Sequence, residues 1–137
     1  GDEVKDKMIG GEAALAVVWS GDAVYMRREN PDLEYIIPKE GSFVWFDSIV
    51  IPNTSKNKKE AELFINYLCQ TDIAYKNTDF VGYSTPHIEA KKMLPKELIS
   101  DKTAYPEESD LEGSEVIEDL AGSLQKYDRI WTEVKSK

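Results

Sequence analysis

Phe43-Val-Trp-Phe-Asp-Ser-Ile-Val-Ile51 is the stretch with the strongest strand pattern in the chain. Aromatic and β-branched residues dominate it, and Pro52 ends it. Two further apolar runs lie upstream, at residues 14–19 and 33–37. The run at 14–19 is continuously apolar rather than alternating, which predicts a strand covered on both faces. We therefore predict three strands of an α/β fold.

Helical patterns surround these runs. Ala61, Phe64, Ile65 and Leu68 recur at the i, i+3, i+4, i+7 spacing, which predicts a helix from Ser55 onward with a buried stripe. Other helices are predicted over residues 2–9, 23–29, 72–80, 88–93 and 96–99. A long amphipathic helix is predicted over 114–134, with Ser114 as its cap. Strands and helices alternate in the first part of the chain, as an α/β fold requires.

Composition limits the classes of function. The chain has 137 residues, of which 41% are hydrophobic and 31% are charged, so it can bury a core. Lysine and arginine number 17 against 26 aspartates and glutamates, which gives a net charge of −9. Such a charge repels phosphate polyanions and favours cationic ligands, so nucleic acid is not expected as a partner.

Cys69 and His87 are the single cysteine and the single histidine. They exclude an intramolecular disulfide and a cysteine-rich metal site, and no nucleophile-elbow pattern accompanies His87. Because Pro86 precedes it, His87 is expected to open a helix rather than to catalyse a reaction. No glycine-rich phosphate loop is present, so we expect no nucleotide, metal or other cofactor.

Two tryptophan and aspartate pairs could carry binding chemistry. Trp45 and Asp47 share one face of the predicted strand, and Trp19 and Asp22 stand where a strand gives way to a helix. An aromatic face attracts an alkylammonium group and covers its methylenes, while a carboxylate accepts its N–H donors. Core packing of the rings and a helix-dipole role for Asp22 would also explain these residues.

Tyr83 lies in the predicted turn Gly82-Tyr-Ser-Thr-Pro86, where a loop could present its ring and hydroxyl to a pocket. A tyrosine that packs on the following helix is the commoner outcome. An acidic run is spread over residues 107–119, and such a run is more often a solvated face than a device that attracts polycations.

The order and spacing of several motifs give the chain a family resemblance. They are Gly11-Glu-Ala-Ala-Leu-Ala-Val-Val-Trp-Ser-Gly-Asp22, Ile37-Pro-Lys-Glu-Gly41, Trp45-Phe-Asp-Ser48, Phe64-Ile-Asn-Tyr-Leu68, Gly82-Tyr-Ser-Thr-Pro86 and Tyr105-Pro106. Through them the chain resembles the C-terminal part of a spermidine/putrescine-binding protein, the solute receptor of a polyamine ABC transporter. This resemblance implies a two-lobed, periplasmic-binding-protein-like (type II) fold and no enzymatic activity.

The resemblance also implies a site and a division of the chain. Trp19 and Trp45 would be walls for a polyamine, Asp22 and Asp47 its ammonium partners, and Tyr83 a hydrogen-bonding wall. Residues 1–46 would belong to the second lobe and 47–101 to the first. Residues 102–137 would form a C-terminal helical segment that returns to the second lobe.

A polar glutamine that contacts an amine in some relatives falls at Ile117 or Glu118, so the preferred polyamine stays open. The family's first part, including its signal region, would precede Gly1. Implied partners are this N-terminal half of the receptor and the permease subunits of the transporter. The implied location is extracytoplasmic, in the periplasm or at the outer face of the membrane, with or without a lipid anchor.

Other functions fit parts of the pattern. Asp22 and Asp47 could be the acid and base of a glycosidase. A receptor of the same fold could bind thiamine or a different organic cation, and a ferric complex is a further candidate. A purely structural interaction domain is the fourth alternative.

Overall fold

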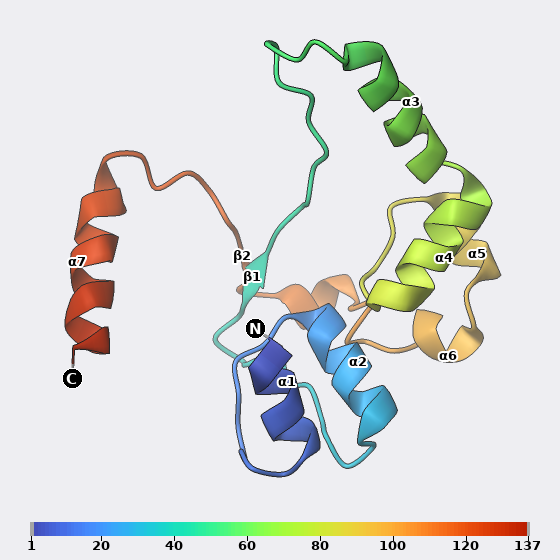
Figure 1. Cartoon of the computed structure of the whole chain (residues 1–137). Coiled ribbons are helices and arrows are strands. Elements are labelled where there is room, and N and C mark those ends of the chain that lie inside the picture. Colours follow the sequence, from blue (N-terminus) through green and yellow to red (C-terminus); the bar gives the residue numbers. More distant parts are fainter. Residues whose placement is uncertain (1, 137) are drawn as a thin grey trace.

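Helices make up most of the regular structure of residues 2–136, the part of the chain that the computed structural model describes (Figure 1). In chain order the elements are α1 (Asp2–Ile9), α2 (Ser20–Glu29), β1 (Phe43–Val44), α3 (Lys58–Leu68), α4 (Thr71–Val81), α5 (Ile88–Met93), α6 (Lys96–Ile99), the 3₁₀ turn η1 (Glu108–Leu111), β2 (Glu115–Val116), the 3₁₀ turn η2 (Ala121–Ser123) and α7 (Leu124–Lys135). The six helices predicted before residue 100 are therefore confirmed. α2 begins three residues earlier than predicted, at Ser20.

The buried core lies where α2, α5 and α6 meet the loop that follows α6. Val24, Leu94, Leu98 and Ala104 are its members, with exposed fractions of 8% or less, and the Tyr75 ring packs against them. These helices pair because each satisfies its backbone hydrogen bonds internally and needs a neighbour only for its apolar face.

The predicted strands are mostly wrong. Residues 14–19 and 33–37 form no strand, and of residues 43–51 only Phe43 and Val44 do so. Leu15 is 92% exposed and Val17 fully exposed, so the run at 14–19 is not covered on both faces. A strand exists only through hydrogen bonds to a neighbouring strand, and within residues 2–136 these apolar runs find almost none.

The one strand pair joins distant parts of the chain. β1 and β2 run parallel, with Phe43 opposite Glu115 and Val44 opposite Val116. Gly41 lies against the backbone of Gly113 just before this pair, with φ of 93°. A side chain at position 41 would overlap that backbone, so glycine is required for the approach.

This pairing also explains why the long helix predicted over 114–134 is wrong. Ser114 caps no helix, because its hydroxyl accepts a hydrogen bond from the Ser42 amide at 3.0 Å. The amides of Glu115 and Ile117 bond to the carbonyls of Ser42 and Val44. Only the last part of the predicted helix forms, as α7.

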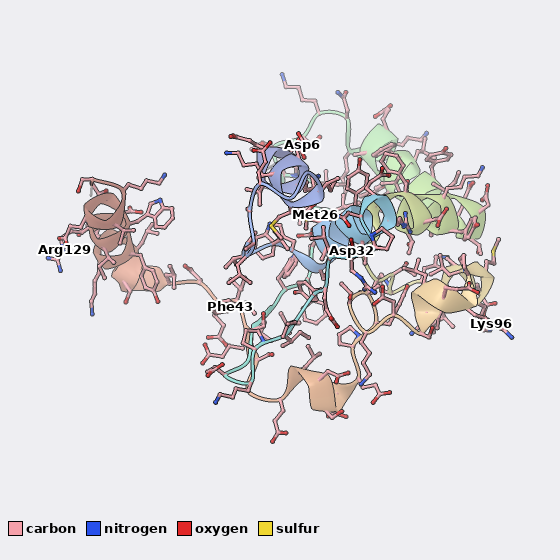
Figure 2. All side chains as sticks on the ribbon, turned by 90° about the horizontal axis from the view of Figure 1, so that it is seen from below. Asp6, Met26, Asp32, Phe43, Lys96 and Arg129 are labelled. Carbon is pink, nitrogen blue, oxygen red and sulfur yellow. The ribbon has the colours of Figure 1, made fainter. Side chains whose placement is uncertain are left out.

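α3 and α7 project away from the core. In Figures 1 and 2 the helix that carries Arg129, α7, stands apart from the rest of the described chain. Its exposed apolar residues include Tyr127 and Trp131, which are 56% and 59% exposed. The stripe of α3 is likewise not buried, since Phe64 is 59% exposed, and this corrects the prediction.

Over residues 2–136, none of the helices has both the length and the apolar character that crossing a membrane requires.

Candidate ligand-binding site

Three aromatic rings from separate segments form a cluster. Trp19 precedes α2 as its N-terminal cap residue, Trp45 follows β1, and Tyr83 lies in the loop after α4. The centroids of the Trp19 and Trp45 rings are 4.5 Å apart with a 60° angle between the ring planes. Trp45 meets Tyr83 nearly edge to face, with centroids 6.1 Å apart. The structure thus brings together the three aromatic residues that the sequence analysis selected.

Gly21 allows the Tyr83 ring to lie on the first turn of α2. A Cβ atom placed on Gly21 would overlap the ring of Tyr83. Gly21 is itself buried although it lies in the first turn of a helix, where glycine costs stability relative to alanine. Close approach of the ring therefore explains the glycine at this position.

Asp22 and Asp47 supply negative charge near the rings. Burial raises the pKa of the Tyr83 phenol above its ordinary value, and the negative charges of Asp22 and Asp47 raise it further. Both carboxylates are therefore within electrostatic range of the same hydroxyl. Trp45 and Asp47 do not share a strand face, however, because β1 ends at Val44 and both residues lie beyond it.

The two carboxylates differ in their partners. Asp22 lies in the first turn of α2, and its Oδ1 is 3.4 Å from the Nζ of Lys5 on α1. Asp47 is exposed, and within residues 2–136 it makes no hydrogen bond or ion pair. Lys5 is the neighbour that sequence reasoning missed, since no periodicity or motif relates a lysine of the first helix to the start of the second.

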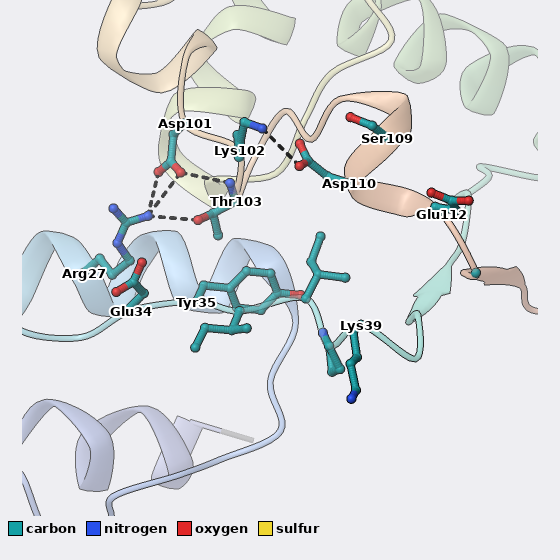
Figure 3. Close-up of a pocket in the computed structure, with 14 residues that line it drawn as sticks. Arg27, Glu34, Tyr35, Lys39, Asp101, Lys102, Thr103, Ser109, Asp110 and Glu112 are labelled. Carbon is teal, nitrogen blue, oxygen red and sulfur yellow. Dashed lines mark hydrogen bonds and ion pairs between the residues drawn. The ribbon is translucent and has the colours of Figure 1, made fainter.

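A separate hollow of about 780 Å³ lies between the segment 34–39 and the part of the chain that carries Asp101, Lys102 and Asp110 (Figure 3). None of the five predicted site residues lines it. Its central charges already have partners, because Arg27 pairs with Asp101 and Lys102 with Asp110, both at 3.0 Å. We therefore assign the candidate site to the aromatic cluster.

Metal binding has no support in this part of the chain. Among the described residues, no group of three or more histidine, cysteine or acidic side chains could hold a metal ion. His87 instead caps α5, because its Nδ1 accepts a hydrogen bond from the Ala90 amide at 3.2 Å. The expectation that His87 opens a helix is confirmed.

Rings beside carboxylates in this arrangement suit a small organic cation. Comparison with known proteins gives the class: the family described as "Bacterial extracellular solute-binding protein" matches residues 1–107. The chain therefore belongs to this family of solute-binding proteins.

Relatives with a solved structure share the fold. A putative spermidine/putrescine ABC transporter protein of Listeria monocytogenes is 43% identical, with a TM-score of 0.90 over 98% of this chain. The spermidine/putrescine ABC transporter substrate-binding protein of Streptococcus pneumoniae is 36% identical, with a TM-score of 0.77 over 99% of it. The predicted periplasmic-binding-protein-like fold class is confirmed.

Among curated proteins, the spermidine/putrescine-binding periplasmic protein 1 of Haemophilus influenzae is 36% identical over 98% of this chain. The chain spans only 38% of that relative and 42% of each of the two solved structures. It thus corresponds to well under half of the relatives' length.

Proposed function

We propose that residues 1–137 are part of an extracytoplasmic receptor that binds spermidine or putrescine for uptake by an ABC transporter. The relatives at 36% and 43% identity are named as spermidine/putrescine proteins. The observation that carries the proposal is the ring cluster with two carboxylates in electrostatic range, in a chain of net charge −9.

Each site residue has a chemical role in this proposal. Trp19 and Trp45 form walls along which the methylenes of a polyamine lie, and Tyr83 adds a third wall and a hydroxyl. Asp47 is the main ammonium partner, because it makes no ion pair within residues 2–136. Asp22 is the second carboxylate of the site.

The proposed lobe boundary crosses this cluster. Trp19 and Trp45 fall in the segment 1–46, which we assign to the second lobe, whereas Tyr83 falls in the segment 47–101, assigned to the first. The contact between Trp45 and Tyr83 therefore joins the two proposed lobes. A ligand at these rings would be held between lobes, as a receptor that closes on its ligand requires.

The proposal also requires a second part of the receptor that residues 1–137 do not supply. The apolar runs at 14–19 and 33–37 lack strand neighbours within residues 2–136, and the relatives are more than twice as long as this chain. The rest of such a receptor would supply neighbouring strands and further contacts to the ligand. We therefore expect residues 1–137 alone to bind polyamine weakly or not at all.

The test is a titration of spermidine followed by tryptophan fluorescence. It uses the chain alone and a chimera in which residues 1–137 replace the equivalent part of the Listeria monocytogenes relative. Saturable binding is expected in the chimera, and Asp47→Asn should weaken it by about 30-fold or more, because a charged hydrogen-bond partner is lost. Asp32→Asn is the matched control, since it removes the same charge from an exposed turn outside the cluster.

Three results would contradict parts of this proposal. A chimera that binds neither spermidine nor putrescine would refute the polyamine function, and tighter binding of thiamine would favour the same-fold alternative. Strong binding by the isolated chain would refute the need for a missing half.

A further inference from the structure

Lys5 has an unusual environment for a lysine in this chain. Its side chain is 22% exposed, whereas the other lysines that form ion pairs are at least 50% exposed. The ammonium lies 3.4 Å from Asp22 and 2.8 Å from Asp2, and 5.4 Å from the centroid of the Tyr25 ring. Lys5 therefore has carboxylates and an aromatic face around it.

The position of Lys5 is fixed by the packing of α1 on α2. At the far end of α1 the Ile9 carbonyl accepts a hydrogen bond from the Asn30 side chain at 3.1 Å. In the middle of α1, the ion pair of Lys5 with Asp22 is the second contact. These two contacts place the ammonium beside the first turn of α2.

That first turn is also where the aromatic cluster lies. The Tyr83 ring packs on Gly21, the residue before Asp22. The positive charge of Lys5 partly offsets the increase that burial, Asp22 and Asp47 cause in the pKa of Tyr83. Lys5 is thus within electrostatic range of the ring that we place in the polyamine site.

The chemistry of this contact matches that of the proposed ligand. A lysine side chain is a four-carbon chain that ends in a primary ammonium, the same end group that putrescine and spermidine carry. Its contacts are the Asp2 carboxylate, the Asp22 carboxylate of the site and the face of the Tyr25 ring, and they are of the kind that an alkylammonium ligand would make.

We propose that Lys5 is an internal cation that occupies the Asp22 carboxylate and thereby sets the preference of the site between polyamines. The inference rests on the polyamine function proposed above. With Lys5 in place, Asp47 is the one carboxylate of the pair that a ligand ammonium reaches without displacing another cation. An additional ammonium, as in spermidine, must compete with Lys5 for Asp22. It therefore contributes less binding free energy than it would if the Asp22 carboxylate were unoccupied.

Calorimetric titration of the chimera with putrescine and with spermidine tests this proposal. Lys5→Gln should strengthen spermidine binding by about tenfold and putrescine binding by about threefold or less. The reason is that the freed Asp22 carboxylate attracts the ligand of higher charge more strongly. Lys5→Arg keeps the positive charge and should stay within about twofold of the parent protein. Lys7→Gln is the matched control, since Lys7 lies on the same helix and pairs with Glu3.

A double-mutant cycle locates the effect. In an Asp22→Asn background, Lys5→Gln should no longer change the ratio of the two affinities, because the carboxylate for which lysine and ligand compete is gone. If Lys5 only stabilises the packing of α1 on α2, the result should differ. The melting temperature of Lys5→Gln should then fall, and the ratio of the two affinities should stay constant.

The outcomes separate the two proposals. If the parent chimera binds neither polyamine, the proposed function is wrong and the role of Lys5 fails with it. If the parent binds but Lys5→Gln leaves the ratio unchanged, or changes it equally in the Asp22→Asn background, only the role of Lys5 is overturned.

Discussion

Leu94 and Leu15 have the same type of side chain but lie in two different regions of the molecule. Leu94 follows α5 and is 5% exposed in the core, whereas Leu15 lies in an extended run and is 92% exposed. The difference is one of backbone hydrogen bonding. A helix satisfies its own N–H and C=O groups and can then pack, but an extended run needs a second strand before it forms part of a sheet. Helices therefore form the core of this chain, and apolar runs of strand type remain uncovered.

The largest effect on stability is expected at the buried leucine, and alanine substitution of both leucines tests this contrast. Leu94→Ala should lower the free energy of unfolding by about 2–4 kcal/mol, because it removes buried methyl groups and leaves a cavity. Leu15→Ala should change it by less than about 0.5 kcal/mol, since the side chain contacts mainly solvent. Urea titration followed by circular dichroism measures both variants. Equal losses for the two would contradict the contrast.

The same pair can sharpen the contrast in the chimera. If the rest of the receptor covers the run at 14–19, Leu15→Ala should become costly there, by about 2 kcal/mol or more. An unchanged Leu15→Ala in a folded, ligand-binding chimera would mean that this run stays uncovered in the receptor as well.

A second prediction concerns the glycine beneath Tyr83. Gly21→Ala should lower the free energy of unfolding by about 1–3 kcal/mol, because the new methyl group overlaps the ring and forces it away. Tryptophan fluorescence should change as well, since Trp45 loses its edge-to-face neighbour. Gly122→Ala is the control: a Cβ atom there meets nothing within 4 Å, so neutrality is expected. Retention of the native spectrum in Gly21→Ala would argue against the close approach.

The cap of α5 should have a smaller effect. His87→Ala removes the acceptor for the Ala90 amide and should cost about 1 kcal/mol of unfolding free energy. His87→Asn should recover most of this loss, because asparagine is a favoured cap residue. Urea midpoints of the three proteins provide the comparison, and an alanine variant as stable as the parent would rule out the capping role.

The smallest effect is expected at the ion pair that joins α2 to the loop after α6. Burial raises the pKa of Asp101, but hydrogen bonds from Thr103 and Arg27 outweigh it and hold the pKa below its ordinary value. Because the folded pKa is lowered, the stabilisation is complete above the ordinary value of 3.8 and is lost as the pH falls through the folded pKa.

Asp101→Asn should therefore cost about 0.5 kcal/mol at pH 7, and the difference from the parent should shrink as the pH falls below 3.8. Urea midpoints measured at pH 7 and at a series of pH values below 3.8 test this. Asp79→Asn is the control, because Asp79 holds Arg28 mainly through its backbone carbonyl, at 2.8 Å. A pH-independent difference for Asp101→Asn would show that its charge is not the cause.

Local patterns were sufficient to predict most helices, and they selected the residues of the proposed site. Glycine pairs, proline breaks and the period of apolar residues predict α1 and α3 to α6, because these signals act within a few residues of the chain. Trp19, Trp45 and Tyr83 could be selected from their neighbouring acids and turn residues. Their mutual contact could not be derived from spacing alone, since it depends on how α2, β1 and the loop after α4 pack.

The failures share one physical reason. The strands predicted at 14–19 and 33–37 and the helix predicted from Ser114 depend on partners that are distant along the chain. Residues 115–117 pair with β1 because Gly41 and Gly113 allow a close backbone approach, and that pairing prevents a helix from starting at Ser114. The local periodicity of apolar residues cannot predict this competition between strand pairing and helix formation.

By itself the sequence determined the helices, the acidic charge and the residue types that could hold an organic cation, because these follow from short-range patterns and composition. The tertiary structure alone decided three things: which apolar runs are buried, that the rings of Trp19, Trp45 and Tyr83 form one cluster, and that the Lys5 ammonium lies 3.4 Å from the Asp22 carboxylate. Each of these depends on contacts between segments far apart in the chain, and the hydrogen bonds and charges that make those contacts exist only once the chain has packed.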